Sequence, residues 1–135
     1  MSEVYKISAV TLLIRDMKRS CNFYSKIPGF RLVYGGIDAL FTTFEIGKNT
    51  FYINLQFLKG SGRNDDECPK NFIKIILHTD DVDKLYNYFK SDIVISSLIS
   101  FENEPANASW GERYFHIRDP DGYLLSFART INPKE

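Results

Sequence analysis

The chain has 135 residues, 44% hydrophobic and 25% charged, a balance typical of one globular domain with a single core. Lysine plus arginine and aspartate plus glutamate each number 17, so the net charge is zero and the basic footprint of a nucleic-acid-binding protein is absent. The apolar runs are far shorter than the roughly 20 residues that span a membrane, and no signal segment is expected.

The first half of the chain predicts a strand, a helix and three further strands. Residues 7–14 alternate as a strand, and Asp16 is a suitable N-cap for a helix over 16–27. Met17, Cys21 and Tyr24 follow at helical spacing, and Pro28-Gly29 ends the helix. Further strands are predicted over 30–34, 39–46 and 51–57.

The second half repeats this order at an offset of 65 residues. A strand over 72–78 precedes a helix capped by Asp80 or Asp81, with apolar Val82, Leu85, Tyr86 and Phe89. Strands are then predicted over 93–98, 113–118 and 123–129. The chain therefore reads as one domain made of two βαβββ modules, at about 5–58 and about 72–130, joined by a polar link over 59–71.

The two cysteines, Cys21 and Cys68, indicate a chain without disulfides. Their number and the lack of a signal segment predict reduced thiols and a cytoplasmic location. Cys21 falls in the helical pattern and is interpreted as a small core residue, whereas Cys68 lies in the polar link.

Near the C-terminus, the segment RDPDGYLLSF joins two apolar strands through Asp119-Pro120-Asp121-Gly122. Proline presets φ at the first turn position and glycine accepts a positive φ, so a tight turn is predicted. Across this turn we expect Phe115 to pair with Ser126, and Arg113 with Ala128.

RDPDGYLLSF resembles the closing hairpin of the vicinal oxygen chelate superfamily, which includes glyoxalases, bleomycin-resistance proteins and extradiol dioxygenases. TLLIRDMKRSCNFYSKIPGF and DDVDKLYNYF resemble the family's two strand-to-helix segments, and the resemblance covers roughly residues 5–130. It implies an α+β fold in which two βαβββ modules form cupped mixed sheets around a cavity, with helices outside. It also implies a homodimer.

The resemblance places four metal-ligand positions of the family at Ala9, Asn54, Lys74 and Ser126. Alanine has no ligating atom, and a lysine ammonium is repelled by a divalent cation. Asparagine and serine are only weak neutral ligands. We therefore expect no metal and no other cofactor, and the metal-dependent glyoxalase and dioxygenase activities are not expected to carry over.

Alternation along the strands predicts which side chains line the expected cavity. The candidates for ligand binding are Tyr52, Asn54, Gln56, Phe72, Lys74, His78, Trp110, Arg113, Phe115 and Ser126. Lys74 is interpreted either as an anion contact or as a side chain that extends to solvent, and Trp110 either as a stacking surface or as a loop anchor. His116 is expected on the face opposite to this wall.

Three functions remain open at this point. The first is a metal-free protein that binds a small aromatic or amphipathic molecule. WGERYFHIRDPDGYLLSF resembles the bleomycin-resistance branch, which sequesters antibiotics, although a neutral chain lacks the acidic groove expected for a cationic drug. The second is a metal-independent lyase or isomerase that uses Lys74 or His78 as acid or base. The third is a small adaptor that contacts other proteins.

Overall fold

The computed structural model describes residues 2–48, 51–58 and 73–131. Residue contacts divide the chain into two compact units, Met1–Arg63 and Asn64–Glu135. The division falls within the predicted link 59–71, which lies outside the described residues together with Phe72 and Cys68. That the two modules make one domain stays a prediction. Within the described residues, no helix is long and apolar enough to cross a membrane.

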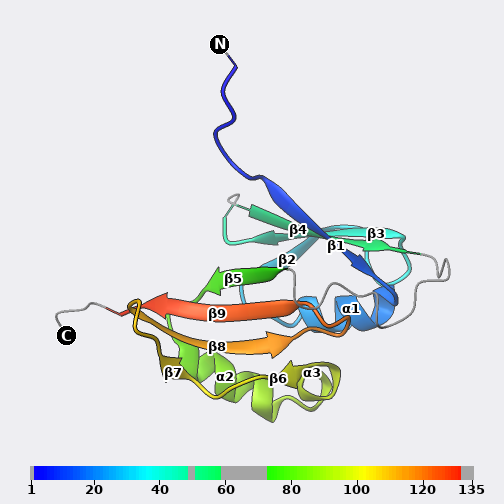
Figure 1. The fold of residues 1–135 in the computed structure, drawn as a ribbon. Helices are drawn as coiled ribbons and strands as arrows, with labels where there is room; N and C mark the ends of the chain where they lie inside the picture. The colour runs from blue at the N-terminus through cyan, green and yellow to red at the C-terminus, as the bar shows by residue number, and fades with distance from the viewer. Residues whose placement is uncertain (1, 49–50, 59–72, 132–135) are drawn as a thin grey trace. The chain divides into compact units, whose positions relative to one another are not determined.

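The first unit has the predicted βαβββ order (Figure 1). Its elements are β1 Ala9–Ile14, α1 Met17–Tyr24, β2 Phe30–Tyr34, β3 Phe41–Ile46 and β4 Phe51–Phe57. The strands form a sheet in the order β1-β4-β3-β2, in which β1 is parallel to β4 and the other neighbours are antiparallel. The sheet is therefore mixed, as the resemblance implies.

Helix α1 begins where its cap residue predicts. The Asp16 carboxylate accepts a hydrogen bond from the backbone N of Arg19 at 3.0 Å, which satisfies one of the unpaired N–H groups of the first turn. Cys21 is 4% exposed, so its interpretation as a core residue is confirmed, and burial raises the pKa of its thiol. The rings of Tyr24 and Phe44, both fully buried, lie 6.3 Å apart in the same core.

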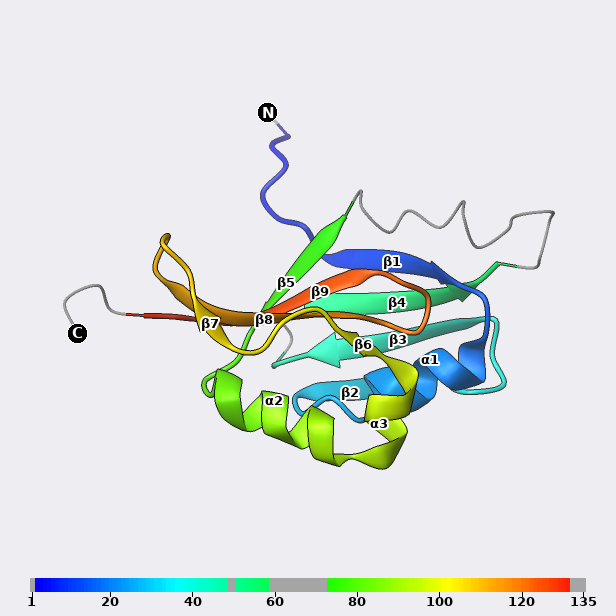
Figure 2. The same ribbon diagram turned by 60° about the horizontal axis from the view of Figure 1, so that its bottom comes forward.

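The second unit has one more helix than predicted. Its elements are β5 Lys74–His78, α2 Val82–Ser91, α3 Ile93–Leu98, β6 Ser100–Phe101, β7 Ala106–Asn107, β8 Glu112–Arg118 and β9 Leu124–Thr130. The strands form a mixed sheet in the order β5-β9-β8-β6, and β7 pairs with the same strand β8. Figures 1 and 2 show α2 and α3 together on one side of β8 and β9. The predicted α+β class with two mixed sheets is thus confirmed.

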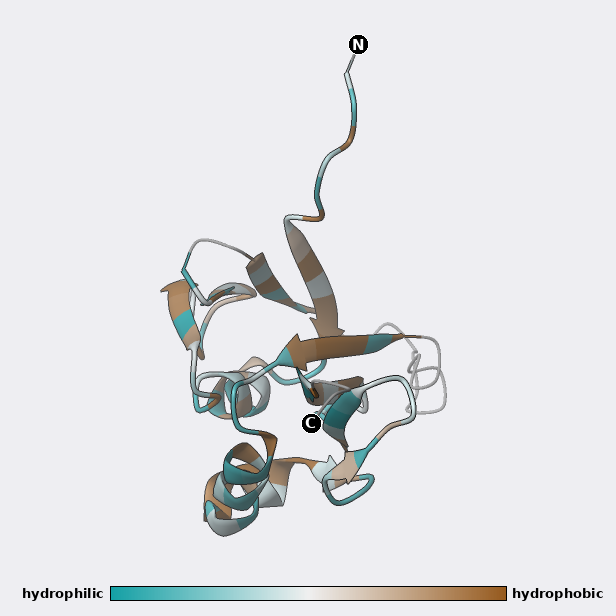
Figure 3. Ribbon diagram, turned by 90° about the vertical axis from the view of Figure 1, so that its left-hand side faces the viewer, coloured by the Kyte–Doolittle hydropathy of each residue, from teal (hydrophilic) through white to brown (hydrophobic). Residues whose placement is uncertain are grey.

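The cap of α2 is Asp81, one of the two residues that the sequence offered. Its carboxylate accepts from the backbone N of Lys84 at 3.0 Å. Val82, Leu85 and Phe89 are buried, and hydrophobic and hydrophilic bands alternate along the helix (Figure 3). One side of α2 therefore packs on β8 and β9 while the other faces water.

The strand predicted over 93–98 is wrong, because these residues form α3. The run of β-branched residues favours a strand. However, the Asp92 carboxylate caps the segment by accepting from the backbone N of Ile95 at 2.9 Å. Ile95 is fully buried whereas Ile93 is 84% exposed, a pattern that one helical turn satisfies. The strand that follows the helices is instead the two-residue β6.

The tight turn between β8 and β9 is confirmed, but the predicted strand pairing is wrong by one residue. Phe115 pairs with Phe127, and Arg113 with Arg129. The buried Asp119 carboxylate accepts from the backbone N of Tyr123 at 2.9 Å, and the Asp119 backbone N donates to the Tyr123 carbonyl, also at 2.9 Å. Tyr123 is thereby held in the turn instead of starting the strand.

Candidate functional site

Each sheet has one face that its own helices do not cover, and we call these the first and second open faces. The second open face is defined by alternation along β5, β8 and β9 and by their pairing. Its members are Lys74, Ile76, His78, Glu112, Tyr114, His116, Arg118, Leu124, Ser126 and Ala128. The first open face contains Ala9, Thr11, Leu13, Phe41, Thr43, Glu45, Tyr52, Asn54 and Gln56.

The predicted site residues are distributed over both faces and beyond them. Lys74, His78 and Ser126 share the second open face. Tyr52, Asn54 and Gln56 share the first. Trp110 precedes β8, and Phe72 lies outside the described residues. That these residues bind a ligand stays a prediction.

Phe115 does not lie on an open face, so its predicted position is wrong. The one-residue shift in pairing turns its side chain toward the helices. Phe115 is fully buried, stacks on Phe127 at 5.3 Å between ring centroids, and meets Tyr86 and Phe89 edge-on at 5.2 and 5.9 Å. Phe115 is therefore a core residue of the second unit.

Arg113 is likewise on the helix side of the sheet, in contrast to its predicted position. Its Nε and one terminal nitrogen donate to the two carboxylate oxygens of Asp83 in α2, both at 2.7 Å. The other terminal nitrogen donates to Asn107 Oδ1 in β7 at 2.9 Å. The hydrogen bond from Arg113 lowers the pKa of Asp83. Arg113 thus links α2 and β7 to β8.

His78 and Trp110 meet at a carboxylate that the sequence analysis did not single out. The imidazole Nε2 of His78 lies 3.2 Å from Glu112 Oε2, and the indole N–H of Trp110 donates to Glu112 Oε1 at 3.0 Å. Both oxygens of Glu112 are engaged, which fixes the orientation of the carboxylate. The arrangement positions one imidazole nitrogen of His78 against a carboxylate, as in acid–base catalytic pairs.

A row of three rings follows β8 on the second open face. Trp110 stacks on Tyr114 with ring centroids 5.9 Å apart and planes at 28°. The ring of Tyr114 lies 4.7 Å from that of His116. Trp110 is 66% exposed, so the indole face turned away from Tyr114 is open to a ligand ring. Tyr114 and His116 were missed by the sequence analysis. Strand alternation would have predicted both on the same face as Ser126 if β8 and β9 had been paired correctly.

Burial is the main cause that lowers the pKa of His116, and the nearby Lys74 lowers it further. Glu102 acts in the opposite direction, and Arg118 lowers it slightly. Because the pKa lies below the ordinary value of 6.5, the neutral form of the imidazole predominates at pH 7.

The first open face carries a buried acid that the sequence did not reveal. Glu45 is 2% exposed, forms an ion pair with Arg31 and accepts from the hydroxyl of Tyr52 at 3.4 Å. Strand β3 reads Phe-Thr-Thr-Phe-Glu-Ile, which has no regular apolar alternation, so the sequence does not predict the direction of Glu45. The carboxylate is compensated by charge and hydrogen bonding, as burial requires.

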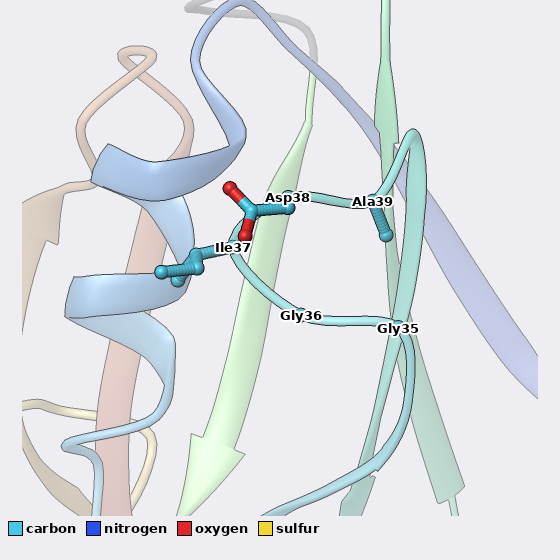
Figure 4. Close-up of a pocket in the computed structure, with 5 residues that line it drawn as sticks. All are labelled: Gly35, Gly36, Ile37, Asp38 and Ala39. Atoms are coloured by element: carbon cyan, nitrogen blue, oxygen red, sulfur yellow. The ribbon is translucent and has the colours of Figure 1, made fainter.

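An open depression of about 520 Å³ lies beside the connection from β2 to β3 in the first unit. Figure 4 shows that all five lining residues, Gly35–Ala39, belong to this loop. Thr42 fixes the loop, since its hydroxyl bonds to the N and the carbonyl of Gly36 at 3.0 and 3.1 Å. None of the predicted ligand residues lines it.

Two successive units, each with a mixed sheet and helices on one side of it, define a class of proteins built from two βαβββ modules. The sequence profile described as "Glyoxalase/Bleomycin resistance protein/Dioxygenase superfamily" matches residues 6–127. The chain belongs to this superfamily, and the family assignment made from the sequence is confirmed.

One relative is similar in sequence, and solved structures are similar in fold. "Uncharacterized protein YwbC" of Bacillus subtilis is 28% identical over 130 residues, covering 90% of this chain and 95% of that protein. A glyoxalase-related enzyme from Fulvimarina pelagi superposes with a TM-score of 0.70 at 16% identity, covering 96% and 90% of the two chains. A hypothetical protein from S. aureus has a TM-score of 0.67 at 20% identity, covering 94% and 98%.

The residues at the family's metal-ligand positions do not fit a metal. In the first unit, the Asn54 amide is bonded on both sides, to Thr43 at 2.7 Å and to Thr11 at 3.1 Å, and the other position is Ala9. In the second unit the positions hold Lys74 and Ser126. Within residues 2–48, 51–58 and 73–131, no group of three or more His, Cys, Asp or Glu side chains could hold a metal ion.

Proposed function

We propose that the protein binds a small aromatic or amphipathic molecule without a metal, in the manner of the antibiotic-sequestering members of its superfamily, and that the ligand lies on the second open face. The observation that carries the proposal is the ring row of Trp110, Tyr114 and His116. Three adjacent rings on a sheet face that the unit's own helices do not cover, one of them 66% exposed, form a stacking surface for a planar ligand.

The test is a titration of the purified protein with bleomycin-type and other aromatic antibiotics, followed by fluorescence of Trp110, the single tryptophan. We expect saturable quenching at one ligand per subunit or fewer. Tyr114→Leu should weaken the binding, whereas Tyr88→Leu on α2 removes an equivalent ring away from the face and should not. Linear quenching across the whole panel, with the protein folded, would contradict sequestration of these compounds.

A second function, metal-independent acid–base catalysis by a lyase or isomerase, is favoured by the 3.2 Å contact between His78 and Glu112. Incubating each bound compound with the protein and following its conversion by mass spectrometry tests this. If the pair is catalytic, His78→Gln abolishes conversion and retains binding. If wild-type protein converts none of the compounds that it binds, the binding function alone stands.

We further propose that the protein acts as a homodimer in the cytoplasm. The dimer is supported by membership of the superfamily, and the location by the sparse cysteines. Sedimentation velocity at several protein concentrations checks the dimer, and a single species with the mass of one 15.6 kDa chain would contradict it.

A further inference from the structure

The charges of the second open face are balanced at every position except one. Arg118 lies 3.4 Å from Glu102, which follows β6, and His78 lies 3.2 Å from Glu112. Lys74 is exposed and has no ion pair or hydrogen bond to any residue that the structure describes. Among the described residues, the face therefore carries one uncompensated positive charge, that of Lys74.

Lys74 and His116 lie on adjacent rows of the same face. The pairing joins Lys74 with Leu124 and Arg118 in one row, and His116 with Ser126 in the next. The two rows are about 7 Å apart along the strands, and β9 lies between the two residues, which adds about 10 Å across the sheet, so the extended lysine side chain spans part of the gap and leaves room for a ligand group. The ammonium acts on His116, since it is among the causes that lower the pKa of the imidazole.

The neutral imidazole of His116 offers one ring N–H, and in the described part of the chain its ring nitrogens have no hydrogen-bond partner. Lys74 and His116 are thus two donors on the same face, with no acceptor among the residues that the structure describes. A carboxylate fits this pair because it accepts from several donors at once and compensates the ammonium. A cationic ligand is disfavoured at the same place by repulsion from Lys74.

We propose that the ligand of the second open face is an aromatic carboxylate, whose carboxylate is bound by Lys74 and His116 and whose ring stacks on Tyr114 and Trp110. This inference rests on the proposed binding function and deepens it by naming the ligand class. The rings of Tyr114 and His116 are 4.7 Å apart, so the stacking surface begins directly beside the anion-binding pair.

The experiment compares three acids with their neutral amides: benzoate with benzamide, indole-3-acetate with indole-3-acetamide, and 2-naphthoate with 2-naphthamide. Binding is measured on the full chain by chemical-shift changes in ¹H–¹⁵N spectra. We expect at least one acid to bind about five- to tenfold more tightly than its amide, the scale of one partly exposed charge-assisted hydrogen bond. The shifts should map to β5, β8 and β9.

Two matched variants assign the preference to Lys74. Lys74→Met removes the ammonium and keeps a chain of similar length, so acid and amide should then bind equally. Lys84→Met makes the same change on the exposed side of α2 and should leave the preference intact. His116→Phe retains the ring and should weaken the acid more than the amide.

The outcomes separate this inference from the function on which it rests. Equal binding of acids and amides by the wild-type protein, or an acid preference that persists in Lys74→Met, overturns the carboxylate inference and leaves small-molecule binding standing. If no member of the panel shifts β5, β8 or β9, the binding function on this face is overturned together with the inference.

Discussion

Two neighbouring residues of β8 give a sharp test of which face of the sheet is core and which is open. Phe115→Leu should destabilise the protein, because Phe115 is fully buried and its ring contacts three others. Tyr114→Leu removes a ring of similar size from the opposite face, where the contacts are to Trp110 and His116. The two substitutions are one residue apart and chemically similar, so they differ mainly in facing.

The magnitude follows from the ring contacts of each residue. An aromatic pair contributes about 0.5–1.5 kcal/mol beyond its buried area. Phe115 loses three pairs that share one ring and are therefore not additive, and leucine keeps most of the apolar burial, so we expect a loss of about 2 kcal/mol. Tyr114 is half-buried and keeps access to water, so we expect a loss of about 0.5 kcal/mol or less.

Urea unfolding followed by far-ultraviolet circular dichroism measures both losses, provided that the slope of the transition is unchanged. The same variants are then titrated with a ligand found in the fluorescence panel. We expect Tyr114→Leu to weaken binding and Phe115→Leu to leave it near the wild-type value. Equal destabilisation by the two variants, or a larger loss for Tyr114→Leu, would refute the assignment of the faces.

Three further predictions concern pH, a turn and a helix cap. The pKa of His116 is below 6.5, so the unfolded chain binds the proton more tightly, and the stabilising contribution is full above about pH 6.5 and is lost as pH falls through the lowered pKa. In urea unfolding between about pH 8 and 5, the wild-type protein should therefore lose stability relative to His116→Phe. A difference in stability that stays constant over this pH range argues against this. Gly35→Ala should lower the stability by about 2–4 kcal/mol, since φ is +81° and a Cβ would lie 2.3 Å from the Phe41 carbonyl oxygen. In the control variant Gly29→Ala, the added Cβ meets no atom within 4 Å. Similar melting temperatures for the two variants would be inconsistent with the clash at Gly35. Asp92→Ala should cost about 0.5–2 kcal/mol through loss of the α3 cap, and no change in the urea midpoint would show that the cap is dispensable.

Much of the fold could be predicted because local chemistry determines it. Asp16 and Asp81 cap equivalent helices 65 residues apart, and β1 and β5 begin at the same offset. Each of these features is decided by a few consecutive residues. The strand predicted over 93–98 failed because the local preference of β-branched residues was outweighed by the Asp92 cap and by the burial of Ile95.

The candidate site was harder to predict, because it depends on a single residue of register. Whether Tyr123 belongs to the turn or to the strand is decided by its bonds to Asp119, which no periodicity reveals. The shift moved Phe115 off the predicted face and placed His116 on it. Lys74 and His78 do share one face of the sheet, as their alternation predicts, because β5 is parallel to β9 and its alternation does not depend on that turn.

The bond between Trp110 and Glu112 gives the protein an internal optical sensor. The chain has a single tryptophan, and its indole N–H is donated to the carboxylate that also lies against His78. A ligand that binds His78 and draws that carboxylate away changes the hydrogen bond of the excited chromophore. The intrinsic emission therefore reports the state of a contact on β5 without any label, and its wavelength can be followed in the same cuvette as binding.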